Sequence, residues 1–188
     1  MKKSKKYSVA VALLILLAVV VFFAARGDAE RQKGGPKAGA EQETASRSSD
    51  DIAYAEQLWE KIEDYTNWPV PEGFEGWQDG ISPHGKYLRY YINDIAKEDF
   101  NKDGAVIVKE NYMEESPDAL AAVTIMQKRK GYDPENNDWF YVKYSPDGKV
   151  MTDDQGRKIA GAVGKGMDEG CVPCHTTAGG GDYLFMND

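Results

Sequence analysis

Two cysteines and a histidine near the end of the 188-residue chain have the spacing with the clearest chemistry. Cys171-Val172-Pro173-Cys174-His175 is a Cys-x-x-Cys-His motif, the attachment signature of c-type haem. In such a site both thiols add to the haem vinyl groups as thioethers, and the adjacent imidazole is held against the iron. We therefore expect one covalently attached haem c, bound through Cys171 and Cys174, with His175 as the iron ligand.

Two other chemistries use closely spaced cysteines. A thioredoxin-like dithiol belongs near a β-α-β pattern in a cytosolic protein, and no stretch of this chain has that pattern. A Cys₂His₂ zinc site would need both His84 and His175, which are far apart in the sequence, and His175 directly follows Cys174. That arrangement fits no usual zinc-finger spacing. The motif therefore favours haem c.

The position of the motif separates the classes of cytochrome. Small electron-carrier cytochromes c place it near the start of the domain and a methionine ligand far downstream, but here only Met186 follows it, too near to reach over the opposite side of the haem. Helical-bundle cytochromes c′ place the motif last, but the strand pattern argues against a bundle. A bis-histidine carrier would have to use His84. That residue lies in a loop, where we favour a surface position or a contact with a haem propionate.

The elements that position the motif are mainly strands. Residues 52–65 have apolar side chains at the spacing of an amphipathic helix. A stretch rich in Pro and Gly follows, which Trp68, Phe74 and Trp77 are expected to pin. Four segments are predicted strands, at residues 87–92, 105–109, 120–128 and 138–144. Because parallel strands would need helical crossovers, we expect an α+β fold, mainly β, with an antiparallel sheet between an N-terminal helix and the C-terminal motif.

The first 50 residues differ from the rest. Residues 7–25 carry no charge, and as a helix rising about 1.5 Å per residue they nearly span a ~30 Å hydrocarbon core. The lysines before them predict that the domain after them is exported. We expect a signal-anchor helix at residues 1–26, a flexible polar linker at 27–50, and a haem domain at 51–188, in the periplasm or otherwise outside the cytoplasmic membrane. Cleavage of a signal peptide near residues 27–29 is the alternative.

The charge of the predicted haem domain restricts its partners. Residues 51–188 contain 14 Lys and Arg against 26 Asp and Glu, which leaves a net charge of −12. Such a surface argues against nucleic-acid binding, which needs cations to displace counterions. It predicts instead a redox partner protein with a basic patch.

Several stretches of the domain carry a family resemblance beyond the haem motif. They are residues 82–94 (SPHGKYLRYYIND), 104–111 (GAVIVKEN), 131–140 (GYDPENNDWF) and 182–185 (DYLF). With the Cys-x-x-Cys-His motif, they resemble in this order the cytochrome P-460 and cytochrome c′-beta family, over most of residues 55–188. The resemblance implies a mainly β, mono-haem c-type fold, a five-coordinate iron with an open site, and homodimers in some relatives.

The resemblance implies roles for Lys109 and Arg89. Lys109, within Gly-x-Val-x-Val-Lys-Glu, looks like the lysine that is bonded to a haem meso carbon in cytochrome P-460, and Arg89 looks like the family's arginine near the haem. From the residues alone, Lys109 either snorkels at a strand end or points into a haem pocket. Arg89 shares a strand face with Tyr87 and Tyr91, which suits stacking on rings and pairing with a propionate, or a purely structural stack.

The resemblance implies two activities. Cytochrome P-460 oxidises hydroxylamine, whereas cytochrome c′-beta lacks the lysine bond and binds nitric oxide and carbon monoxide without turnover. A simple electron-transfer cytochrome is the third alternative. Oxidation would make Lys109 and Arg89 catalytic candidates and would benefit from a proton-relaying carboxylate. Asp168 and Glu169 are candidates, and Glu110 is the weakest because it alternates away from Lys109.

Overall fold

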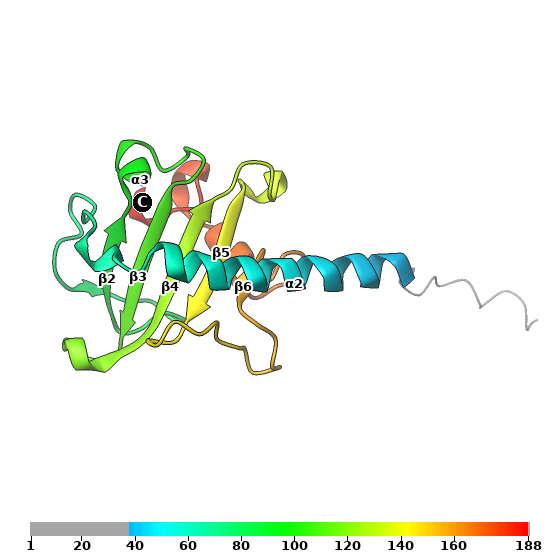
Figure 1. The fold of residues 1–188 in the computed structure, drawn as a ribbon. Helices are drawn as coiled ribbons and strands as arrows, with labels where there is room; N and C mark the ends of the chain where they lie inside the picture. The colour runs from blue at the N-terminus through cyan, green and yellow to red at the C-terminus, as the bar shows by residue number, and fades with distance from the viewer. Residues whose placement is uncertain (1–37, 188) are drawn as a thin grey trace, which may run out of the picture. The chain divides into compact units, whose positions relative to one another are not determined.

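One antiparallel sheet of six strands forms the centre of the computed structural model, which describes residues 38–187 (Figure 1). The strands lie in the sheet in the same order as in the sequence. They are β1 (Gln78–Asp79), β2 (Tyr87–Ile92), β3 (Val106–Tyr112), β4 (Leu120–Lys128), β5 (Trp139–Tyr144) and β6 (Ala160–Gly161). The prediction of a mainly β, antiparallel α+β fold is therefore confirmed.

The strand bounds follow the predictions closely, with one difference at the site. β2 and β4 have the predicted bounds, and β5 begins one residue later than predicted. β3 continues three residues beyond Lys109, to Tyr112. The strand continues because the polar residues Glu110 and Asn111 are buried there with hydrogen-bond partners. Lys109 therefore lies in the middle of a strand, and the strand-end alternative for its side chain is wrong.

The helix before the sheet begins earlier than predicted. α2 spans Ala38–Lys61 rather than residues 52–65, and its first half falls within the 27–50 segment that we expected to be a linker. The sequence there is rich in Ala, Glu and Gln, which favour helix. The predicted signal anchor at residues 1–26 lies outside the described residues. None of the helices in residues 38–187 has the length and apolar character that crossing a bilayer requires.

The remaining helices are short and connect the strands. α3 (Asp94–Glu98) follows β2, and the Asn93 side chain caps it by accepting a hydrogen bond from the Ala96 backbone at 2.9 Å. α4 (Cys171–His175) is the haem motif itself. The other turns are 3₁₀-helices, namely η1 (Tyr65–Asn67), η2 (Pro117–Ala119), η3 (Pro134–Asn136), η4 (Gly179–Gly181) and η5 (Phe185–Asn187).

Each face of the sheet has its own apolar core, because side chains alternate along every strand. On the helix face, Ala55 and Leu58 of α2, with Ile62 just after it, pack in one cluster with strand residues that include Val108 and Ile125. On the other face, called here the motif face, the cluster holds Ile107, Met126, Tyr141, Val172 and Leu184. In Figure 1, the part of α2 after Glu43 crosses in front of the sheet and the C-terminal segment lies behind it. The motif therefore packs on the face opposite α2.

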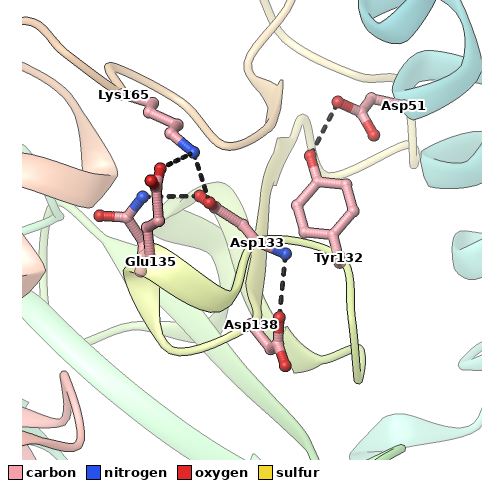
Figure 2. A network of polar contacts seen from close by, with 7 residues as sticks. Asp51, Tyr132, Asp133, Glu135, Asp138 and Lys165 are labelled. Carbon is pink, nitrogen blue, oxygen red and sulfur yellow. Dashed lines mark hydrogen bonds and ion pairs between the residues drawn. The ribbon is translucent and has the colours of Figure 1, made fainter.

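A polar network fixes the loop that leads to the motif (Figure 2). Lys165 Nζ lies 2.6 Å from a carboxylate oxygen of the buried Asp133 and 2.9 Å from one of Glu135. The neighbouring Tyr132 hydroxyl donates a hydrogen bond of 2.8 Å to the Asp51 carboxylate of α2. The connection between β4 and β5 is thus bonded both to the helix and to the loop before α4.

Candidate haem site

The start of α4 is determined by the close approach of two loop segments, one at residues 163–164 and the other at residues 169–170. Gly170 precedes the helix with a φ of 133°, and a Cβ atom there would lie 2.7 Å from the Gly164 Cα atom. Only glycine tolerates both the positive φ and this contact. The Val172 backbone N–H donates to the Val163 carbonyl at 3.0 Å. The two loop segments therefore hold the first turn of the motif against the sheet.

The imidazole of His175 is oriented as an iron ligand requires. It is buried, and its Nδ1 atom lies 2.8 Å from the Tyr183 carbonyl oxygen. Because a carbonyl only accepts, Nδ1 carries the hydrogen and Nε2 keeps its lone pair free. Burial lowers the pKa of His175 to about 4, so the ring is neutral at pH 7.

The segment after the motif supports this orientation of His175. The Trp139 indole N–H donates to the Asp182 carbonyl at 2.9 Å, and the Asp182 carboxylate accepts from the Leu184 backbone at 3.0 Å. Leu184 itself is buried in the motif-face core. These bonds on both sides of Tyr183 fix the carbonyl that accepts from His175.

Both cysteines of the motif are free thiols, Cys171 half-buried and Cys174 exposed. Burial raises the pKa of the Cys171 thiol to about 11. A catalytic dithiol needs a thiol with a depressed pKa, so this site is unsuited to dithiol exchange. Within residues 38–187, no three His, Cys, Asp or Glu side chains are grouped so that they could hold a metal ion directly.

A cavity of about 990 Å³ lies between the motif and the sheet. Two cross-strand rows on the motif face contribute to its wall, Lys109–Thr124–Lys143 and Ile107–Met126–Tyr141. The motif residues Cys171, Cys174 and His175 line the same cavity. Its volume lies at the upper end of the range of about 300–1,000 Å³ that is typical of ligand and cofactor sites.

The residues around this cavity fit a haem group. The hydroxyl of Tyr141 is buried without a hydrogen-bond partner among the described residues, and a buried polar atom normally has one. Two free thiols and an imidazole with a free Nε2 line the same space, together with the apolar side chains of Ile107, Met126 and Val163. Thioether attachment, one axial nitrogen ligand and an apolar wall are what a covalently held porphyrin requires.

Lys109 lines the cavity from the middle of β3. It pairs in register with Tyr90 of β2 and Thr124 of β4, and its Nζ atom lies 5.5 Å from the centroid of the Tyr90 ring. Desolvation lowers the pKa of Lys109 to about 8, although the nearby Cys171 raises it. A fraction of the amine is therefore neutral, and nucleophilic, at physiological pH.

Arg89 is not brought to the site. It pairs with Glu110, whereas its neighbour Tyr90 pairs with Lys109. Since successive residues of a strand point to opposite faces, Arg89 and Lys109 lie on opposite sides of the sheet. The guanidinium lies 6.0 Å from the centroid of the Tyr91 ring, so the stack predicted on Tyr91 is present. The expected position of Arg89 beside the haem, and with it a catalytic role, does not agree with the structure.

The candidate proton-relaying carboxylates are divided between the two faces. Glu110 is buried on the helix face, where it accepts hydrogen bonds from the hydroxyls of Tyr65, Tyr91 and Tyr112 at 2.9, 3.1 and 2.7 Å. Because the sheet separates it from the cavity, Glu110 cannot serve there.

Asp168 and Glu169 are exposed and line the cavity, as do Asp153 and Asp154 of the turn after β5. The sequence analysis missed Asp153 and Asp154, because nothing in the local sequence of their turn indicates that it folds back on the motif.

His84 lies in the cavity rather than on the outer surface. Its Nδ1 atom is 2.9 Å from the Asn111 Oδ1 atom, and its ring centroid is 6.5 Å from that of His175, with the ring planes at 88°. Of the two alternatives favoured from the sequence, the surface position is therefore wrong, whereas the contact with a haem propionate stays a prediction. One sequence signal could have indicated a position of His84 near the motif: His84 and His175 are the two histidines of the chain.

An antiparallel sheet with a Cys-x-x-Cys-His helix and a cavity between them defines a mainly β protein of the c-type haem class. A comparison with protein families agrees. The family model for cytochrome P460 matches residues 62–186, about two-thirds of the chain. The chain therefore belongs to the cytochrome P460 family, a family of c-type haem proteins. A comparison with curated proteins finds no match.

Proposed function

We propose that this protein carries one haem c, attached at Cys171 and Cys174 with His175 on the iron, and that it binds and oxidises a small nitrogen species such as hydroxylamine on the opposite side of the iron. When bound, the haem supplies an iron that can hold a small ligand and pass electrons. The observation that carries the proposal is the position of Lys109, which lines the same cavity as the motif.

Lys109 sets oxidation apart from simple gas binding in this proposal. A bond from its Nζ atom to a meso carbon of the porphyrin would distort the macrocycle and tune its electronics. Forming that bond would replace one N–H and one C–H bond and release two protons and two electrons, so it would require an external oxidant such as a peroxide. The pKa of about 8 for Lys109 supports the reaction, because it leaves part of the amine unprotonated.

Other residues of the cavity have supporting roles. The Tyr183 carbonyl holds His175 in one tautomer, and the apolar side chains of Ile107 and Met126 exclude water from the site. Asp168 and Glu169 at the cavity edge can take up the protons that oxidation of a nitrogen substrate releases. Arg89 has no part in this scheme.

The cellular setting is also part of the proposal. We propose that residues 1–26 anchor the protein in the membrane and that the haem domain lies in the periplasm or otherwise outside the cytoplasmic membrane. Electrons would leave to a redox protein with a basic patch, because residues 51–188 carry a net charge of −12 and opposite charges steer association.

A second candidate function is electron transfer without substrate turnover. It is favoured by His84, which lies in the cavity close to His175 and could occupy the position that a substrate would need.

The test is the optical spectrum of the ferrous holoprotein, made in a host competent for cytochrome c maturation. A Soret band well to the red of ordinary haem c indicates the lysine bond, and Lys109→Ala should abolish the shift. Lys143→Ala is the matched control, because Lys143 lies in the same cross-strand row. Mass spectrometry should find Lys109 joined through the porphyrin to the 171–175 peptide, and hydroxylamine should reduce an added electron acceptor.

Three outcomes would contradict the proposal. A red-shifted band that survives Lys109→Ala would refute the crosslink. An ordinary haem c spectrum with nitric oxide binding and no hydroxylamine oxidation would identify a gas-binding protein. A colourless protein with the mass of its amino acids alone would exclude haem altogether.

A further inference from the structure

We infer that the mouth of the cavity is the surface on which a cationic electron-transfer protein docks. This docking surface has an apolar centre at Ile81, Met167 and Phe185, with the carboxylates of Asp168 and Glu169 beside it. The inference rests on the proposed function in that it requires haem at the Cys-x-x-Cys-His motif. It adds the place where the redox partner binds, which the net charge of the domain alone does not indicate.

Three exposed apolar side chains lie around the haem motif. Ile81 is 77% exposed, Met167 is 47% exposed and Phe185 is 44% exposed. Ile81 directly precedes Ser82 and Pro83, which line the cavity, and Met167 lines the cavity itself. Side chains as exposed as these contribute little to the core of the fold. Apolar side chains that are exposed together commonly mark an interaction site.

Phe185 connects the docking surface to the proposed iron ligand. Its ring centroid lies 5.4 Å from that of the His175 imidazole, with the ring planes at 63°. The neighbouring Leu184 is buried in the motif-face core, which holds this segment in place. Electron transfer slows steeply with distance, so a partner has to come close to the iron ligand. A protein that contacts the exposed part of Phe185 is separated from the His175 ring by one side chain.

The charge beside the apolar centre is acidic. Asp168 and Glu169 directly follow Met167, and both are exposed and line the cavity. Protein interfaces commonly combine an apolar centre with a polar rim. The docking surface therefore has the composition of an interface, with a rim that attracts cations.

The exposed cations in the cavity wall do not cancel this charge. Arg157 is paired with Asp153 at 2.7 Å. The Lys158 amine donates to the Val150 carbonyl at 2.7 Å, and the exposed carboxylate of Asp154 in the same wall offsets its charge. Among the exposed residues that the structure describes in this wall, the two carboxylates of the docking surface therefore remain unbalanced.

A cationic redox protein fits the docking surface better than a second copy of the chain. Residues 51–188 carry a net charge of −12, so two copies repel each other, whereas a basic partner is attracted. Complexes between redox proteins are also small, with about 1,200 Å² or less of buried surface in total. Three exposed apolar side chains suit an interface of that size.

The reaction at this surface is the transfer of one electron. The haem domain is oxidised by one electron and the metal centre of the partner is reduced by one, and no bond forms or breaks. The transfer can be started with chemically reduced protein. It can therefore be measured without hydroxylamine and does not depend on the bond to Lys109.

The experiment mixes the reduced holoprotein with the oxidised form of a basic, lysine-rich cytochrome c and follows electron transfer by stopped-flow absorbance. At low ionic strength, the double variant Asp168→Asn, Glu169→Gln should react about threefold more slowly or less. The difference should shrink at about 0.15 M salt, where charges are screened beyond about 8 Å.

The chain offers a matched control for these charges. Glu114 and Glu115 also follow an exposed methionine, Met113. They belong to the connection between β3 and β4, at the lower left of Figure 1, whereas the C-terminal segment lies in the upper part. The double variant Glu114→Gln, Glu115→Gln should change the rate by less than about 1.5-fold, because these charges lie far from the docking surface.

The apolar centre is tested in the same assay. Ile81→Ser and Met167→Ser should each slow the transfer by about threefold or more, also at high salt, because burial of apolar surface does not depend on charge. Met113→Ser is the control, since Met113 is 50% exposed, and it should leave the rate unchanged. Reduction of ferricyanide, a small anion, should not be slower in any of these variants.

Three results would overturn the inference. Equal slowing by the changes at Glu114 and Glu115 would reduce the effect to net charge. A parallel loss of ferricyanide reduction would show that the variants alter the haem itself. A wild-type dimer that Ile81→Ser dissociates, measured by analytical ultracentrifugation, would assign the surface to a second copy of the chain. Each result leaves a Lys109-dependent red shift and hydroxylamine oxidation intact, whereas absence of covalent haem would end both the inference and the proposed function.

Discussion

Lys109 and Glu110 are consecutive residues of β3, and their side chains lie on opposite faces of the sheet. Lys109 lines the cavity beside the haem motif, whereas the Glu110 carboxylate accepts hydrogen bonds from three tyrosine hydroxyls on the helix face. A substitution of Lys109 should therefore change the chemistry in the cavity, whereas a substitution of Glu110 should change the stability of the fold.

Glu110→Ala should lower the unfolding free energy of the holoprotein by about 3 kcal/mol, because it leaves three largely buried tyrosine hydroxyls without their acceptor. Glu110→Gln should cost about 1 kcal/mol, since its amide oxygen still accepts. Guanidinium unfolding followed by tryptophan fluorescence measures both. The optical spectrum of the haem should be unchanged in either variant, and a spectral change without a loss of stability would instead place Glu110 at the haem.

Stability should decrease in strongly alkaline solution. Burial raises the pKa of Tyr65, Tyr91 and Tyr112 above the ordinary value of a tyrosine. The neighbouring Glu110 carboxylate raises the pKa of all three further. Above about pH 10 the unfolded chain loses these protons while the folded protein keeps them, so each tyrosine lowers the unfolding free energy by up to about 1.4 kcal/mol per pH unit. Denaturation at a series of pH values should give a smaller slope for Tyr112→Phe, and an equal slope would contradict the assignment.

Removal of the attachment residues should separate covalent binding from iron ligation. The double variant Cys171→Ser, Cys174→Ser should carry no covalent haem, as haem staining after denaturing electrophoresis measures. His175→Ala should keep the haem on the polypeptide and change its optical spectrum, because the thioethers remain and the axial nitrogen is lost. Haem that stays attached in the double variant would contradict the role of the motif.

The network of Figure 2 should be measurable as stability. Lys165→Met leaves the carboxylate of Asp133, whose side chain is only 3% exposed, without its cation. We expect a loss of about 1–2 kcal/mol, less than for a fully buried pair because Lys165 itself is partly exposed. Lys149→Met is the control. It breaks an equally short pair with Asp147 whose side chains are 82% and 56% exposed, and it should have no measurable effect on stability because water screens the pair. Equal effects in the two variants would argue against the network.

Most of the sheet could be predicted from local sequence. The strands Tyr87–Ile92 and Leu120–Lys128 have the predicted bounds, because their β-branched and aromatic residues favour strand over the whole length. The end of β3 was missed because Glu110 and Asn111 suggest an exit to solvent. They are buried through tyrosines and a histidine from other parts of the chain, which no local pattern shows.

The site could be predicted only in part. The spacing of the haem motif is local, and strand alternation correctly separates Glu110 from Lys109. The same alternation did not reveal the face of Arg89, because that depends on which residues of β2 and β3 pair, and register is a tertiary property. The surface alternative for His84 failed for a similar reason, since its partner Asn111 lies 27 positions away.

The matching order of the strands in the sheet and in the sequence bears on how the protein is made. Each strand can join the growing sheet as soon as it has been synthesised, since its partner has already emerged. The cysteines emerge after every strand. If haem is attached there as proposed, maturation would load it onto a scaffold that is already assembled, and a failure to load it should leave a paired sheet rather than an unfolded chain.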